Sequence, residues 1–318
     1  MARPLINPAL GLNLVTERTL EKLNDPLVTV LIPAHNEAAT VAGVVADAEA
    51  GLSALSVRGE VLVSASGCTD DTAAVATEAG AIVVEAPAGK GAALRAGLTK
   101  AAGDVVCLVD GDMQYFGDRT LVEILVAPIL AGIADATVSD LYWRPLYPQL
   151  WLHGFFAPIA GRLFPEMLPK VGSTPWSGQR AAKRELWPTS LPDGFTVDLA
   201  ILLWWNRHAL RLRPVLADDW VNPQRPKPDL MAAELELLTS TAIEQGRLRD
   251  DQVDDVQRWY DQVHELMAAY DPEQHDPTQF EQHVLQVSME KLPYLPSRSP
   301  RERVTWEEGE REHGGHGE

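Results

Sequence analysis

The strongest constraint on the fold is a repeated alternation of short apolar runs with helix-forming segments over residues 27–110. Apolar runs rich in β-branched residues predict buried strands, and the polar or alanine-rich segments between them predict helices. Strands that alternate with helices of this length are typical of crossover connections on a parallel sheet. The predicted strands are 27–34, 60–66, 81–85 and 104–110, and the predicted helices are 37–50, 69–79 and 90–102.

The alternation becomes less regular after residue 120 and then stops. A helix over 121–130, a strand over 135–143, a helix over 197–208 and a strand over 212–216 follow, with a Pro-, Gly- and Trp-rich middle between them. Residues 221–229 are too rich in proline for regular structure. Residues 230–290 are acidic and predict three amphipathic helices.

These patterns predict an α/β fold with a mainly parallel, Rossmann-like sheet, helices on both faces and a helical C-terminal extension. The expected division is a lead-in over 1–25 with one short helix, a ligand-binding catalytic domain over 26–229, the helical extension over 230–293 and a charged flexible tail over 294–318. Strand ends at the carboxyl edge of such a sheet are where ligands bind.

Charge and composition narrow the class of function. The formal net charge of −18 argues against nucleic-acid binding, because phosphate neutralisation needs clustered Lys and Arg. Cys68 and Cys107 could form one disulfide, but a reduced cytoplasmic chain is favoured. No signal peptide and no transmembrane helix are expected. The apolar segment 150–164 is interpreted as core, with a loop that touches a membrane or a partner as the alternative.

Asp110-Gly111-Asp112 directly follows the predicted strand over 104–110. Gly111 lets the backbone turn and lets a ligand approach closely. Carboxylate oxygens suit Mg²⁺ or Mn²⁺, and such an ion would neutralise the diphosphate of a nucleotide-sugar as the sugar bond breaks. A solvated acidic turn is the alternative, but the position at a strand end favours a binding site.

Three further polar clusters are expected at the same edge. Glu37 follows the first strand and could accept hydrogen bonds from a base or a ribose. Ser66, beside Gly67, follows the second strand and leaves room for a planar base. Lys90 stands between two glycines at a helix start, where a diphosphate or a uracil could bind. Asp198 enters an apolar helix and either marks the helix start or faces a sugar hydroxyl.

The segments LVTVLIPAHNE, SGCTDDT, GKG and VDGD together resemble the nucleotide-diphospho-sugar glycosyltransferases of the GT-A fold. The nearest resemblance is to glucosyl-3-phosphoglycerate synthases and their mannosyl relatives, and it continues through the segments DLYWRPL, SGQRAAKREL, GFTVDLAILL and RPKPDL, over about residues 27–240. It implies a nucleotide-sugar donor, UDP-glucose or a GDP-sugar, a small-molecule acceptor, Mg²⁺ or Mn²⁺, and retention of the anomeric configuration.

The resemblance also implies roles for particular residues. Asp112 and Asp198 are the expected catalytic residues, Asp112 toward the metal and Asp198 toward the hydroxyls of the transferred sugar. Trp176 and Gly178 are expected beside the acceptor or the sugar. The expected nucleotide-sugar contacts are Pro33, Ala34, Glu37, Ser66, Lys90, Asp110, Gly111 and Asp112.

Two departures from the family are visible. Gln224, or a neighbour, stands where the family has a histidine as metal ligand, so Gln224 joins Asp112 as a candidate ligand. The segment YPQLWLHGFF lacks the arginine that an acceptor phosphate would favour. A sugar or lipid-like acceptor on aromatic side chains is therefore an alternative, with Trp143, Trp151 and Trp176 as surfaces.

Three hypotheses follow: a retaining transferase, an inverting transferase with Asp198 as general base, and a non-catalytic nucleotide-sugar binding protein. The helical extension is a candidate interface for a homodimer.

Overall fold

The structure, a computed structural model, describes residues 6–7, 12–13, 23–113, 118–140, 150–172, 177–217 and 228–295. Its centre is a seven-stranded sheet made of β3 (Leu27–Ala34), β4 (Arg58–Ser66), β5 (Ile82–Ala86), β6 (Val105–Leu108), β7 (Ala136–Asp140), β8 (Arg180–Lys183) and β9 (Leu212–Leu216). The strand order is β5-β4-β3-β6-β8-β7-β9. All neighbouring strands are parallel except β8, which is antiparallel to both β6 and β7.

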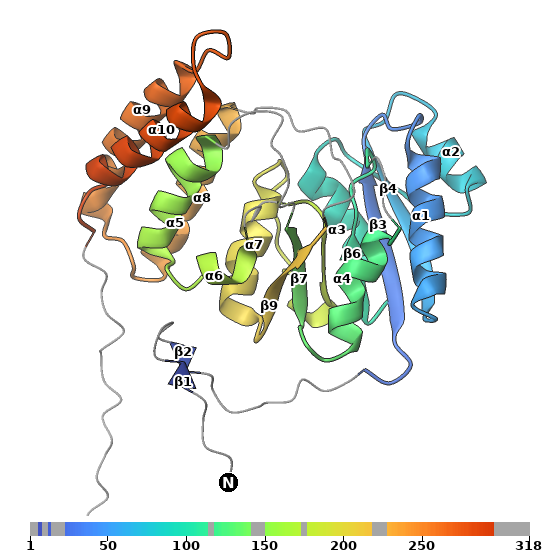
Figure 1. Ribbon diagram of the computed structural model, residues 1–318. Coiled ribbons are helices and arrows are strands. Elements are labelled where there is room, and N and C mark those ends of the chain that lie inside the picture. The colour runs from blue at the N-terminus through green and yellow to red at the C-terminus, as the bar shows by residue number, and fades with distance from the viewer. Residues whose placement is uncertain are drawn as a thin grey trace, which may run out of the picture.

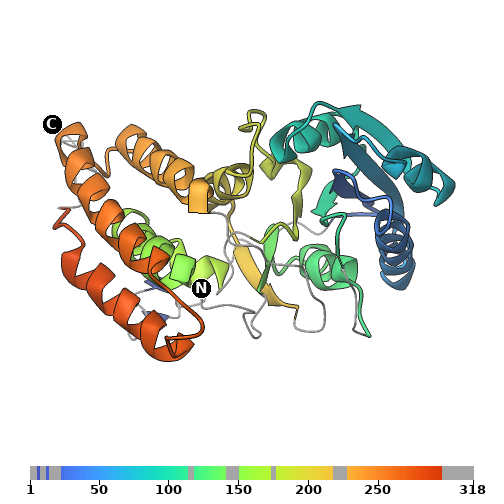
Figure 2. The same ribbon diagram turned by 90° about the horizontal axis from the view of Figure 1, so that it is seen from above.

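Helices cover both faces of this sheet because successive side chains of a strand point to opposite faces. Val30 and Ile32 belong to one apolar cluster, which they share with α1 (Val41–Ala54), α2 (Thr72–Glu78) and α4 (Leu121–Leu130). Leu31 belongs to the other cluster, which includes α3 (Lys90–Lys100) and α7 (Val197–His208). Seen from above, α1 and α4 lie on one side of the sheet, and α3 and α7 lie on the other (Figure 2). The α/β fold predicted from the sequence is confirmed.

Most of the predicted elements agree with the structure. The helices over 121–130 and 197–208 and the strand over 212–216 end at the predicted residues. The fourth strand is shorter than predicted and ends at Leu108. Strand β8 was not predicted, because its four residues, RAAK, carry no apolar alternation. Pairing with strands on both sides forms β8, so tertiary contacts rather than local propensity define it.

The lead-in differs from the prediction of a short helix. Four of its described residues form β1 (Ile6–Asn7) and β2 (Leu12–Asn13), which pair antiparallel with each other. Pro8, a residue unsuited to a helix interior, directly follows β1. The helix prediction is therefore wrong for these four residues.

The apolar segment after residue 150 is core, as predicted. It forms a π-helical turn, η1 (Trp151–Phe156), followed by α5 (Ala157–Leu163) and the short α6 (Leu168–Val171). Phe155, Phe156 and Ile159 are fully buried. The large apolar side chains of this segment therefore face the protein interior.

Three C-terminal helices, as predicted, cover that segment: α8 (Pro228–Glu244), α9 (Val253–Ala268) and α10 (Pro277–Lys291). The Trp151 indole donates a hydrogen bond to Glu234 Oε2 at 2.7 Å, and Ser288 Oγ donates to the Gly154 carbonyl at 2.6 Å. The helices therefore share the core of the sheet's second half. They lie at the end of the molecule opposite α1 and α2 (Figures 1 and 2). Short 3₁₀ turns, η2 (Arg184–Leu186) and η3 (Asp250–Gln252), precede α7 and α9.

Two further expectations can be compared with the described residues. Cys68 and Cys107 are both free thiols, in agreement with the reduced state favoured by the sequence. No helix among the described segments has the length and apolar character needed to cross a membrane.

Candidate functional site

The Asp110-Gly111-Asp112 turn is fastened to the end of β3. The Gly111 amide donates to the Pro33 carbonyl at 3.3 Å, and the Gly111 carbonyl accepts from Thr40 Oγ1 at 2.9 Å. The same Thr40 hydroxyl lies 2.9 Å from Glu37 Oε2. A Cβ at position 111 would lie 3.1 Å from the Pro33 carbonyl oxygen and 3.2 Å from the Ala34 Cβ, a tight contact that favours glycine. The structure thus brings together the predicted residues from the first and fourth strands.

Lys90 is the centre of the site. Its Nζ lies 3.1 Å from Asp110 Oδ1 and 2.8 Å from Asp198 Oδ2, and all three side chains are 12–17% exposed. Burial alone would lower the pKa of Lys90, but the two carboxylates outweigh it and raise that pKa. Lys90 therefore remains charged and joins β6 to the start of α7.

Two residues at the start of β8 hold the two carboxylates from the other side. Gln179 Nε2 donates to Asp110 Oδ2 at 3.1 Å. Arg180, which is fully buried, donates from Nη1 to the Asp198 carbonyl at 2.9 Å, and its Nη2 lies 3.4 Å from Asp198 Oδ1. Side-chain contacts thus run from Gln179 through Asp110, Lys90 and Asp198 to Arg180, and the peptide bond between Gln179 and Arg180 closes the circuit, which we call the Lys90 ring.

Sequence reasoning missed Gln179 and Arg180 as site residues. Both stand in the segment SGQRAAKREL, which carried the family resemblance without a role for either side chain. The one available signal was a charged residue next to two alanines, which is unusual in a buried position. Gly178 was expected beside the sugar, and its place in the structure explains a different need. A side chain there would collide with the Asp110 carboxylate.

Asp112 is the carboxylate of the turn that lacks a close cation. Burial and the nearby charges of Asp110 and Glu37 raise its pKa to about 6. A divalent cation would relieve this repulsion, so the charge distribution fits a metal. In the described segments, no three His, Cys, Asp or Glu side chains are grouped so that they could hold one.

The Gly89-Lys90-Gly91 segment is shaped by a neighbouring loop. The Gly91 amide donates to the Asp193 carbonyl at 2.8 Å, and a side chain at Gly91 would overlap the Pro192 carbonyl. This amide is therefore already bonded, so the cationic contribution of the segment to a ligand comes from the Lys90 side chain. The glycines serve the close approach of the two chain segments.

Ser66 supports the same segment from below. It is 2% exposed, and its hydroxyl donates to the Pro87 carbonyl at 2.6 Å and lies 3.2 Å from the Gly89 carbonyl. Its own carbonyl accepts a hydrogen bond from His35 Nδ1 at 2.6 Å, which fixes a proton on that ring nitrogen. The structure places Ser66 next to the ring segment, with its hydroxyl turned toward the loop.

Several predicted residues fall outside the site or outside the described residues. Trp176 and Gln224, and also Trp143, lie outside the described residues. Trp151 belongs to the helical half of the core, where its ring stacks on Phe156 with centroids 5.0 Å apart. Its indole nitrogen is bonded to Glu234, so these contacts occupy the ring expected to receive an acceptor.

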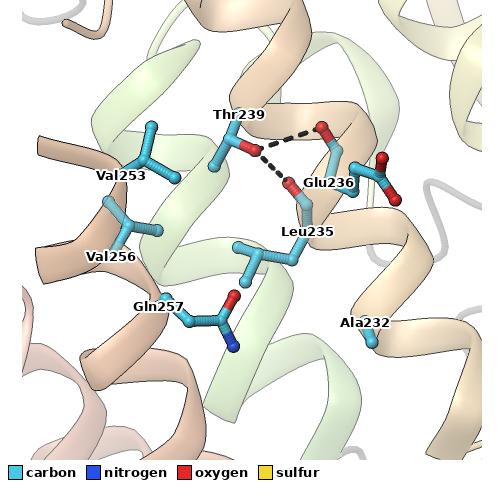
Figure 3. A pocket seen from close by; sticks show the side chains of 7 residues that line it. All are labelled: Ala232, Leu235, Glu236, Thr239, Val253, Val256 and Gln257. Atoms are coloured by element: carbon cyan, nitrogen blue, oxygen red, sulfur yellow. Dashed lines mark hydrogen bonds between the residues drawn. The ribbon is translucent and has the colours of Figure 1, made fainter. Parts of the chain in front are cut away.

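A hollow of about 270 Å³ lies elsewhere, between α8 and α9. Figure 3 shows that Leu235, Val253 and Val256 line it together with polar side chains, among them Glu236 and Thr239. The Thr239 hydroxyl is bonded to two helix carbonyls at 2.8 and 3.1 Å. No residue of the Lys90 ring lines this hollow, and we assign no chemistry to it.

Known proteins are similar to this chain in sequence and in fold. The glucosyl-3-phosphoglycerate synthase of Mycobacterium tuberculosis is 34% identical over 197 residues, which are 55% of this chain and 60% of the relative. The low-salt glycan biosynthesis hexosyltransferase Agl6 of Haloferax volcanii is 29% identical over 174 residues, which are 52% of this chain and 40% of the relative. The match thus spans about three fifths of the first relative's length.

A solved structure of the Mycobacterium tuberculosis synthase, in complex with Mn²⁺, UDP-glucose and phosphoglyceric acid, superposes with a TM-score of 0.56 at 30% identity. The similarity covers 68% of this chain and 80% of that chain. A second structure of the synthase, with Mg²⁺ and UDP, gives a TM-score of 0.55 at 29% identity over 68% and 79% of the two chains. The sequence pattern of glycosyl transferase family 2 matches residues 29–186, which include Lys90, Asp110, Gln179 and Arg180. The chain has a GT-A fold and belongs to glycosyl transferase family 2.

Proposed function

We propose that this chain is a metal-dependent glycosyltransferase that moves a hexose from a nucleotide-diphospho-sugar to a small acceptor. The observation that carries the proposal is Lys90, held by Asp110 and Asp198 at the carboxyl edge of the sheet beside Asp112. UDP-glucose is the first candidate donor, because it is bound in the structures of the related synthase. A GDP-sugar is the second.

On the donor side, we assign the nucleoside to the edge formed by Pro33, Ala34, Glu37 and Gly111, with Ser66 behind it. The residue nearest to a diphosphate is then Lys90, the buried cation of this edge. A fixed cation in a site with little water stabilises the negative charge that develops on a departing diphosphate.

Asp112 is the described residue that would hold Mg²⁺ or Mn²⁺, with Gln224 as the predicted second ligand. When bound, such an ion supplies positive charge to the leaving nucleoside diphosphate. Relatives support this assignment, because solved structures of the synthase contain Mn²⁺ or Mg²⁺ together with UDP.

We assign Asp198 to the hydroxyls of the transferred sugar. Lys90 and Arg180 both contact its carboxylate, which favours a group that holds hydrogen-bond donors over a group that must take up a proton. This supports retention of the anomeric configuration. Inversion, with Asp198 as general base, is the alternative, and NMR of the product anomer separates the two.

For the acceptor we propose a small phosphorylated acid, as in the phosphoglyceric acid complexes of the related synthase. The aromatic-surface alternative is weakened because Trp151 is used by Phe156 and Glu234. The cytoplasmic location, the homodimer and the domain limits at residues 25, 229 and 293 stay predictions.

The experiment measures transfer of labelled glucose from UDP-glucose to 3-phosphoglycerate by the purified chain with Mn²⁺. Asp112→Asn should reduce turnover by about 10²–10³-fold, because it removes the carboxylate assigned to bind the metal. Asp254→Asn, at an exposed position on α9, is the matched control and should leave turnover unchanged. Full activity of Asp112→Asn would refute the metal assignment, and absence of transfer from any UDP- or GDP-hexose would refute the function.

A further inference from the structure

Two oxygen atoms in the described part of the chain are buried without a hydrogen-bond partner: Gln179 Oε1 and Asp198 Oδ1. Both belong to the Lys90 ring. Every other buried side-chain nitrogen or oxygen that the structure describes has a partner. A buried acceptor without a donor costs free energy, so two of them in one site indicate groups shaped for a ligand.

The orientation of the Gln179 amide follows from its neighbours. Nε2 lies 3.1 Å from Asp110 Oδ2 and 2.8 Å from Met113 Sδ, and both of these atoms are acceptors. Rotating the amide would place Oε1 against the Asp110 carboxylate, acceptor against acceptor. Oε1 is therefore held on the side of the amide that faces away from Asp110.

The ring defines what kind of ligand these oxygens can take. A phosphate oxygen is itself an acceptor, so it cannot satisfy either of these two oxygens, and the diphosphate is assigned to the Lys90 side chain instead. A neutral hydroxyl offers the hydrogen that an orphan oxygen lacks. Asp198 Oδ2 accepts a hydrogen bond from Lys90, whereas Oδ1 lies 3.4 Å from Arg180 Nη2 without a hydrogen bond, so Oδ1 is the atom of that carboxylate that can still accept one from such a hydroxyl.

We infer that Gln179 is a specificity-determining residue whose Oε1 accepts a hydrogen bond from one hydroxyl of the transferred sugar, while Asp198 Oδ1 accepts one from another. The inference rests on the proposed function, because the sugar must be delivered into this ring by its nucleotide. Gln179 then contributes to the choice between hexoses that differ in the orientation of a single hydroxyl.

The test compares binding of UDP and of UDP-glucose, with Mn²⁺ present, by calorimetry. Gln179→Met keeps the length of the side chain and removes the oxygen and the nitrogen of its amide. Gln179→Leu is a second variant in case the first does not fold. The ratio of the two dissociation constants isolates the sugar. We expect either variant to shift this ratio by about tenfold against UDP-glucose, with UDP binding unchanged within about twofold.

Thr137→Val is the matched control. Thr137 is fully buried in β7 next to β8, and its hydroxyl donates to the Leu125 carbonyl at 2.8 Å, outside the Lys90 ring. This variant should lower the melting temperature and leave the ratio unchanged. UDP-sugars that each lack one hydroxyl extend the test: wild-type protein should disfavour one of them by about tenfold, and Gln179→Met should not.

The outcomes separate the two claims. If the Gln179 variants bind UDP as wild-type does and keep its ratio, the inference is refuted and the nucleotide-sugar function stands. The same conclusion holds if UDP and UDP-glucose weaken equally, because the residue would then act only on the fold. If wild-type protein binds neither UDP nor any UDP-hexose, both the function and the inference fall.

Discussion

Helix α7 carries a cluster of charged side chains near each end, and the two clusters are built differently. Near its start, Asp198 belongs to the Lys90 ring, in which two buried oxygens have no partner. Near its end, Asn206 donates from Nδ2 to Glu166 Oε1 at 2.9 Å and accepts from Lys170 at 2.8 Å. Arg247 binds both oxygens of Glu166, at 2.8 and 3.0 Å.

This second group, Glu166, Lys170, Asn206 and Arg247, is the Arg247 cluster. Burial alone would raise the pKa of Glu166, but the hydrogen bonds from Arg247 and Asn206 lower it. The Arg247 guanidinium also lies over the Phe164 ring, 5.1 Å from its centroid. The hydrogen bonds of Glu166 and Asn206 link the residues of the Arg247 cluster to one another, and we interpret the cluster as structural. The Lys90 ring, in contrast, leaves two acceptors without a donor from the protein, as expected for a site that binds a ligand.

The largest expected difference between the clusters is in catalysis. Lys90→Met should reduce glucose transfer by about 10³-fold, because it removes the cation assigned to the diphosphate. Arg247→Met removes a cation of the same charge from the other cluster and should change turnover by less than about threefold. Steady-state rates of both variants, each checked for folding by circular dichroism, measure the contrast. Equal losses in the two variants would break the comparison.

Stability should separate the clusters in the next largest way. Arg180 is fully buried and faces the Asp198 carboxylate. Arg180→Met therefore leaves the buried charge of Asp198 with one partner fewer. The loss expected from breaking a buried pair is about 3–5 kcal/mol. The Arg247–Glu166 pair is 32% and 39% exposed, so solvent screening limits the loss for Arg247→Met to about 1 kcal/mol.

Urea denaturation of the two variants measures this difference. A larger loss for Arg247→Met than for Arg180→Met would mean that the Arg247 cluster, not the Lys90 ring, is the more tightly coupled part of the structure.

The smallest effect concerns pH. The pKa of Asp112 is raised to about 6, above its value in an unfolded chain, so the folded protein binds an extra proton between about pH 4 and pH 6. Ionising Asp112 therefore costs stability, fully so above pH 6. A metal needs the ionised form, so thermal stabilisation by Mn²⁺ should be weak at pH 5 and complete above about pH 7.

The control for this effect is Asp112→Asn, in which stabilisation by Mn²⁺ should be small at every pH. Arg247→Met should keep the wild-type pH profile, since the Arg247 cluster is not assigned a metal. Stabilisation that is as strong at pH 5 as at pH 7.5 would contradict a role for Asp112 in binding the ion.

The limits of sequence reasoning follow the same division. The first-half strands and the helix with Asp198 were predictable because apolar runs and caps are local signals. Strand β8 was not, since RAAK is stable as a strand only between β6 and β7. The burial of Arg180 depends on Asp198, 18 residues further along the chain. No local pattern reveals a partner of that kind.

The donor-site residues show a similar limit. Lys90 was expected to meet a ligand from a helix start, and its actual neighbours, Asp110 and Asp198, come from two other elements. Gly91 also depends on a residue far away in the sequence, because a side chain at position 91 would overlap the Pro192 carbonyl. Glycine signals a close approach, but a single sequence does not say what approaches.

The packing of the C-terminal helices around η1 and α5 sets an order for folding during synthesis. Phe155, Phe156 and Ile159 become fully buried in a core that includes Val284 of α10, far later in the chain. At roughly 5–20 residues per second, on the order of ten seconds pass before that cover leaves the ribosome. During this interval a strongly apolar segment waits without its cover, and a nascent chain released early would expose it to aggregation and to chaperones.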